Sequence, residues 1–126
     1  MNGGIPSSKG YGGFPGNICI SVNDCLVHGI PSRSIILKEG DIVSYDVVVT
    51  KHGYMADAFR TYPVGEISLE AKRLIQTTKE AFFNGVKLIK PGIRLGVVSN
   101  AIYKTAIEQG YTVTSEFTGH GIGRDM

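Results

Sequence analysis

Alternating apolar and polar residues mark two neighbouring stretches as the strands of a hairpin. Residues 41–50 read Asp-Ile-Val-Ser-Tyr-Asp-Val-Val-Val-Thr, and a second run extends from about Tyr54 to Tyr62. β-branched and aromatic residues dominate both runs, which is typical of strands. Lys51-His52-Gly53 lies between them and is the predicted turn, and Pro63 ends the second strand.

Shorter extended pieces are expected before this hairpin. Residues 18–22 predict a strand that ends at the turn-forming pair Asn23-Asp24. Residues 27–31 suggest a strand end running into a loop, and residues 35–37 suggest another short extended piece. The Gly- and Pro-rich residues 1–16 are expected to form an irregular N-terminal segment.

A helical period replaces the alternation after Pro63. Ser68 is the expected N-cap of a helix whose apolar stripe continues to about Leu88. Gly85 lies inside this stripe and costs about 1 kcal/mol relative to Ala, so the helix could end or bend there. A second helix is predicted over residues 95–109, with Gly110 as its stop.

Residues 111–117 alternate again and predict a last strand. The order of strands, two helices and one strand is typical of an α+β fold with an antiparallel sheet. A chain of 126 residues fits a single domain, and no internal repeat divides it.

Two aspartates occupy the predicted hairpin. If Thr50 and Gly53 close a two-residue loop, Asp46 lies directly opposite Asp57, with β-carbons about 5 Å apart. Two carboxylates at such a short distance repel each other, or one of them becomes protonated. A divalent cation between them would remove that energetic penalty. Together with His120, the pair suits manganese, iron, cobalt or zinc. The alternative from the residues alone is two solvated carboxylates and an ordinary turn histidine.

Composition and charge limit the classes of binding partner expected for this protein. The net charge is +2 and the Lys and Arg residues are scattered, which gives no argument for nucleic acid or a membrane surface. No apolar run approaches the roughly 18 residues of a membrane-spanning helix, and the N-terminus lacks the apolar core of a signal peptide, so a cytoplasmic location is expected. Cys19 and Cys25 match no zinc or redox spacing, so free thiols are predicted over a disulfide.

Eight short stretches, in order, carry a family resemblance. The chain resembles the type I methionine aminopeptidases, metallo-aminopeptidases with the pita-bread α+β fold. The matching stretches are Gly-Tyr-Gly-Gly-Phe-Pro (10–15), Ile-Cys-Ile-Ser-Val-Asn-Asp (18–24), Val-His-Gly-Ile-Pro (27–31), Gly-Asp-Ile-Val-Ser-Tyr-Asp-Val (40–47), Ala-Asp-Ala (56–58), Pro-Val-Gly (63–65), Lys-Pro-Gly (90–92) and Gly-His-Gly-Ile-Gly-Arg (119–124).

The resemblance implies roles for individual side chains. Asp46, Asp57 and His120 match the family's metal-binding positions. His28 matches a histidine that is not a ligand but touches the substrate and helps to stabilise the reaction. The positions that line the pocket for the N-terminal methionine side chain are matched by Tyr11, Phe14 and Cys19, and also by Ser8 and Met126.

The resemblance also implies a chain truncated at both ends. The family's catalytic domain is about twice as long, so residues 1–126 correspond to about one half of a pita-bread fold. In the family, two divalent ions activate a water against the first peptide bond, and two glutamates from the second half complete their coordination. Those two glutamates have no match here.

The functional expectation is therefore a methionine aminopeptidase-like metallopeptidase that is weak or inactive as this truncated chain. Its substrates would be peptide N-termini beginning with Met. A homodimer is expected to replace the missing half, because a lone half exposes an apolar sheet face and a raw edge. The alternative is a non-catalytic peptide- or protein-binding module of the same fold.

Overall fold

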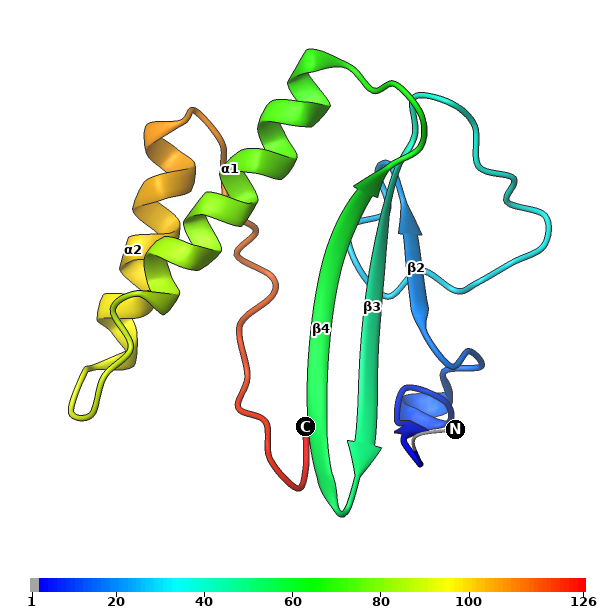
Figure 1. Cartoon of the computed structure of the whole chain (residues 1–126), viewed down its shortest axis with the longest axis horizontal. Helices are drawn as coiled ribbons and strands as arrows, with labels where there is room; N and C mark the ends of the chain where they lie inside the picture. The colour runs from blue at the N-terminus through cyan, green and yellow to red at the C-terminus, as the bar shows by residue number, and fades with distance from the viewer. Residues whose placement is uncertain (1–2) are drawn as a thin grey trace. The chain divides into compact units, whose positions relative to one another are not determined.

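The computed structural model describes residues 3–126, which divide into two compact units (Figure 1). The sheet unit comprises Met1–Ile67 together with Gly119–Met126, and the helix unit comprises Ser68–Thr118. No helix in the described part of the chain is long and apolar enough to cross a membrane.

The sheet unit is built around one long central strand. This strand, β3 (Ile42–Lys51), pairs along its length with β4 (Tyr54–Pro63). The short strands β1 (Ile5–Pro6) and β2 (Cys19–Val22) pair with β3 as well, and every pairing is antiparallel. Because β4 occupies one whole edge of β3, β1 and β2 share the other edge. The antiparallel α+β architecture predicted from the sequence is confirmed.

Two local expectations differ from the structure. In the N-terminal segment expected to be irregular, residues 1–2 lie outside the described part, and residues 3–16 contain only the short β1 and one 3-10 turn at Tyr11–Gly13. Neither residues 27–31 nor residues 35–37 form a strand, although the carbonyl of Gly29 accepts a bond from Ile20 N–H (2.9 Å) beside β2. A single backbone hydrogen bond does not form a β-ladder, so residues 27–31 are not a strand of the sheet.

The hairpin turn lies one residue later than predicted. Lys51 pairs with Tyr54, so the two loop residues are His52 and Gly53, with φ of 52° and 78°. Positive φ at both central positions is what a type I′ hairpin turn requires, and glycine satisfies it without strain. The register therefore differs from the predicted one, and Asp46 pairs with Phe59 while Asp57 pairs with Val48.

The corrected register leaves the two aspartates on one face. Directly paired residues share a face, and side chains two apart along a strand point the same way. Asp46 and Asp57 are therefore diagonal neighbours that share a face with Val48, which is 4% exposed. The other face carries Val43, which is 2% exposed, so each face contributes to the small core.

The helix unit pairs two helices, α1 (Leu69–Val86) and α2 (Leu95–Glu108). As predicted, Ser68 caps α1, with its hydroxyl accepting a bond from Ala71 N–H at 3.0 Å, and Gly110 follows α2 with φ of 82°. The helix α1 ends at Val86, one residue after Gly85, close to where the sequence suggested that it could end. Residues 111–117 form no strand, and the prediction of one there was wrong.

Candidate metal centre

The cluster begins with the two carboxylates on β3 and β4. The strand register makes Asp46 and Asp57 diagonal neighbours on one face, and the two side chains interact electrostatically. Burial raises the pKa of Asp46, and the Asp57 charge raises it further. The charges of His28 and His120 oppose this rise. The two histidines thus act electrostatically on the carboxylate that the sheet partly buries.

His120 reaches the same place from the far end of the sequence. Its Nε2 lies 3.6 Å from Asp57 Oδ2, and its Nδ1 lies 2.9 Å from the carbonyl oxygen of Gly121. The backbone holds this segment beside β4, since Met55 N–H donates to Gly123 O at 2.7 Å (Figure 1). This hydrogen bond at the strand edge and the histidine itself both help to bring together residues 63 positions apart in the sequence.

His28 follows β2 in a strained turn. Its φ of 57° is uncommon for a residue other than glycine. The next residue, Gly29, donates its N–H to Ser21 Oγ (3.1 Å) and lies so close to β2 that a β-carbon would be 2.1 Å from Ile20 O. Only glycine fits there, and this close approach fixes where the His28 side chain begins.

Cys19 lies directly opposite Asp46 in the β2–β3 pairing and is buried. Burial raises the pKa of the Cys19 thiol, and the negative charges of Asp46 and Asp57 raise it further. Cys25 is exposed, and both cysteines are free, so the prediction of free thiols is confirmed. The thiol therefore keeps its proton beside the carboxylates.

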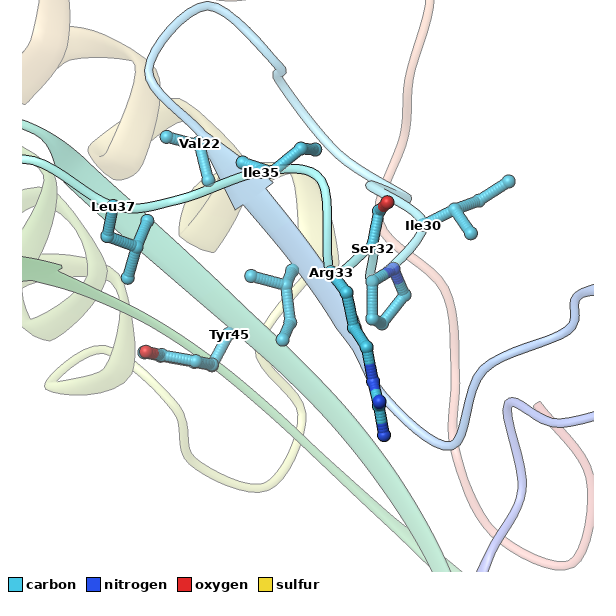
Figure 2. A pocket seen from close by; sticks show the side chains of 9 residues that line it. Val22, Ile30, Ser32, Arg33, Ile35, Leu37 and Tyr45 are labelled. Atoms are coloured by element: carbon cyan, nitrogen blue, oxygen red, sulfur yellow. The ribbon is translucent and has the colours of Figure 1, made fainter.

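The remaining predicted pocket residues also lie in the sheet unit. Ser8 is buried, Phe14 and Met126 are half-buried, and Tyr11 is 63% exposed in the 3-10 turn. A cavity of about 320 Å³ lies in another part of this unit (Figure 2). It is lined by the loop that follows β2 and by Ile20, Val22 and Tyr45, which face away from Asp46. That cavity is therefore separate from the carboxylate cluster.

The donor chemistry of the cluster fits a divalent cation, because it offers carboxylates and an imidazole. In the described structure, however, the side chains of this cluster are not arranged as a coordination shell around one point. Among residues 3–126, no three His, Cys, Asp or Glu side chains gather closely enough to hold a metal ion. Asp57 contacts both Asp46 and His120, but two pairwise contacts through one shared residue are not a common point for three ligands. The three predicted ligands therefore approach each other as two pairs, Asp46 with Asp57 and Asp57 with His120, and not at one common point.

Two residues of the cluster's surroundings escaped the sequence reasoning. The Arg124 guanidinium carbon lies 5.3 Å from the centre of the Tyr54 ring, and Nη2 lies 3.4 Å from the Tyr54 hydroxyl. The only sequence signal was an arginine at the end of the Gly-His-Gly-Ile-Gly-Arg stretch, which does not reveal its partner.

Comparisons with known proteins show which protein family this chain is similar to. The profile of metallopeptidase family M24 matches residues 2–126. The methionine aminopeptidase of Clostridium acetobutylicum is 50% identical over 122 residues, covering 97% of this chain and 49% of that protein. Methionine aminopeptidase 1 of Bacillus subtilis is 48% identical over 124 residues, covering 98% of this chain and 50% of that protein.

Solved structures agree with the sequence comparisons. The crystal structure of methionine aminopeptidase from Thermotoga maritima matches with a TM-score of 0.94 and 45% identity, over 97% of this chain and 49% of that one. The enzyme from Rickettsia prowazekii matches with a TM-score of 0.92 and 44% identity, over 96% and 48%. The chain spans about half the length of the relatives it matches, and its sheet and helices correspond to about half of their pita-bread fold.

Proposed function

This chain belongs to metallopeptidase family M24, and we propose that it carries the metal-binding part of a methionine aminopeptidase-like site. Family membership implies dependence on a divalent metal ion. The proposed substrates are peptides and proteins whose N-terminal residue is methionine, as the names of the relatives suggest. Both units are proposed to belong to one partial domain, since the family match runs through both, and the proposed location is cytoplasmic.

One observation carries the proposal. Asp46 and Asp57 are diagonal neighbours on one sheet face, near enough for the charge of Asp57 to raise the pKa of Asp46, and His120 Nε2 approaches Asp57 Oδ2 to 3.6 Å from a distant part of the sequence. A purely structural sheet gains nothing from two carboxylates in contact, because like charges there are destabilising. We propose these three side chains as ligands of cobalt, manganese, iron or zinc.

The other residues have proposed roles around this centre. A bound divalent ion supplies Lewis-acid activation of water and of a carbonyl group. His28 is proposed to contact the substrate near the scissile bond, because its charge already reaches Asp46. Tyr11, Phe14, Cys19 and Met126 are proposed to line the pocket for the methionine side chain.

Activity of the 126-residue polypeptide alone is expected to be weak or absent. Two carboxylates and one imidazole can hold one ion, whereas a closed site with two ions needs further ligands. The test is release of methionine from a Met-Gly-Met peptide with added Co²⁺ or Mn²⁺, followed under single-turnover and multiple-turnover conditions. Efficient multiple turnover by this polypeptide would contradict the proposal of a weak site.

A second candidate is a peptide- or protein-binding module without catalysis. The observation favouring it is that no three donor side chains of the described residues form a ready metal shell. Calorimetry separates the two candidates. Binding of Co²⁺ that is abolished by His120→Ala supports the metal site, whereas binding of a Met-initiated peptide with no measurable Co²⁺ binding supports the module.

We also propose that the polypeptide forms a homodimer. Large apolar side chains are exposed in both units, among them Ile36 at 71% in the sheet unit and Leu95 at 78% in the helix unit. Exposed apolar surface of this kind favours self-association.

A further inference from the structure

The loop that carries His120 has open space at the positions where its glycines lack a β-carbon. A β-carbon at Gly119, Gly121 or Gly123 would meet no atom within 4 Å, and glycine leaves the backbone free to choose among conformations. The side chain of His120 is itself 52% exposed. Two contacts further along the segment help to hold the imidazole near Asp57.

One such contact lies in the plane of the sheet. Lys51 and Tyr54 close the two-residue hairpin, so their backbone groups bond to each other and those of Met55 point away from β3. Met55 N–H donates to Gly123 O at 2.7 Å. This bond attaches the segment to the outer edge of β4 two residues from Asp57.

The second contact lies on the opposite face of the sheet from His120. Alternation along β4 places Tyr54 on the face away from Asp57. Arg124 sits over the Tyr54 ring, with its guanidinium carbon 5.3 Å from the ring centre and Nη2 3.4 Å from the hydroxyl. The segment thus straddles the edge of β4, with the histidine on one face and the arginine on the other.

We propose that Arg124 is a positioning residue, which clasps Tyr54 across the edge of β4 and thereby holds His120 beside Asp57. The inference rests on the proposed function only for the role of His120 as a metal ligand. The ring contact supplies most of the attraction, because the 3.4 Å hydroxyl contact is long for a hydrogen bond. The guanidinium acts through Gly123 and the backbone and does not touch the carboxylates.

The direct test is amide hydrogen exchange of Met55, measured by NMR on the 126-residue chain. Arg124→Ala and Arg124→Gln both remove the cation and are expected to speed Met55 exchange about two- to fivefold, the range for losing a cation–ring contact at an exposed site. Arg124→Lys keeps the cation and is expected to stay within about twofold of the wild type. Arg33→Ala, which removes the same charge from another loop of the sheet unit, is the matched control and should change nothing.

A second readout follows the imidazole itself without metal. In the wild type, Asp57→Asn is expected to shift the ¹⁵N resonances of His120, since the two side chains are neighbours. The same substitution made in the Arg124→Gln background is expected to shift them by less than half as much. Unchanged Met55 exchange in Arg124→Gln, or an undiminished response of His120 to Asp57→Asn, would overturn the clasp.

Cobalt titration by calorimetry then tests whether the contact between Arg124 and Tyr54 affects binding at the proposed metal site. If His120 is a ligand, Arg124→Gln is expected to weaken Co²⁺ binding about two- to fivefold, in step with the change in Met55 exchange. A wild type that binds no Co²⁺ would refute the proposed metal site. The exchange and resonance measurements would still decide the clasp, so the two failures are distinguishable.

Discussion

Asp46, a proposed metal ligand, shows how a side chain placed for binding can oppose folding. Its raised pKa, caused first by burial and then by Asp57, means that the fold favours the protonated carboxyl. The folded state then binds more protons than the unfolded state between the ordinary pKa of about 3.9 and the raised value. The stability contribution of Asp46 is complete below that ordinary pKa and is lost as pH rises through the raised pKa. Above that raised pKa, the ionised Asp46 beside Asp57 is unfavourable to folding of the metal-free chain.

Replacing Asp57→Asn should separate stability from binding. The pKa of Asp46 is expected to fall but to stay above its ordinary value, because burial, its largest cause, remains. Stability at neutral pH should rise by up to about 1 kcal/mol, the range for relieving a like-charge pair across strands. Co²⁺ affinity should fall at least about tenfold, since even indirect supports of a metal ligand are worth that much.

Thermal unfolding and cobalt calorimetry of the Asp57→Asn variant measure the two effects. Asp24→Asn makes the same chemical change at an exposed position and serves as the control. A variant that loses stability and keeps its cobalt affinity would show that the pair serves the fold.

Gly29 is the residue on which the placement of His28 depends. In Gly29→Ala, the new β-carbon would lie 2.1 Å from Ile20 O and 2.9 Å from Ser21 Cα, both backbone atoms that cannot rotate away. We expect a loss of about 1–3 kcal/mol, as for other overpacked sites, together with altered NMR resonances of His28. Gly96→Ala is the control, because its β-carbon meets no atom within 4 Å. An equal effect of both substitutions in thermal unfolding would contradict the steric argument.

At the level of single elements, the hairpin shows what the sequence reveals and what it conceals. The strand-forming pattern located both strands to within a residue or two, and the parity of the pairing was right, so both aspartates fell on one face. The loop residues were misplaced by one position because the prediction did not require positive φ at both loop sites. Placing Gly53 inside the loop would have given the observed pairing of Asp46 with Phe59.

The helix pair depends on Gly85. Alanine gains about 1 kcal/mol of helix propensity over glycine. A β-carbon at Gly85, however, would lie 2.7 Å from Ile102 Cγ1 and 2.9 Å from Cδ1. Ile102 is β-branched and stiff at χ1, so overpacking of about 1–3 kcal/mol is expected to outweigh the gain. Gly85→Ala should therefore lower the melting temperature.

A double-mutant cycle with Ile102→Ala checks this explanation. Removing the Ile102 side chain leaves room for the new methyl group, so Gly85→Ala should become stabilising in that background. The expected coupling between the two sites is about 0.5–3 kcal/mol. Additive effects in chemical unfolding would show that Gly85 is needed for some other reason.

For the molecule as a whole, the sequence predicted individual helices and strands better than the contacts between segments far apart in the sequence. The two helices and the Ser68 cap follow from local rules, and they were found where expected. The strand at 111–117 failed because alternation alone does not supply a pairing partner, and a strand exists only in a ladder. Likewise, the hairpin pairing pointed to Asp46 and Asp57 and the resemblance added His28 and Cys19, whereas the contact of Arg124 with Tyr54 depends on a backbone path that no local pattern encodes.

The proposed homodimer is a property of the whole chain. Light scattering at micromolar concentration should give twice the 13.6 kDa mass of one chain. The mass is expected to be independent of Co²⁺, because apolar surface drives the association. A mass of one chain over this range would be evidence against the dimer.

The contrast between the two cysteines has a practical consequence. Alkylating reagents attack the thiolate, so the shielded, proton-retaining Cys19 should be slow to react while the exposed Cys25 reacts readily. A maleimide dye can therefore be attached at Cys25 of the natural sequence without mutagenesis.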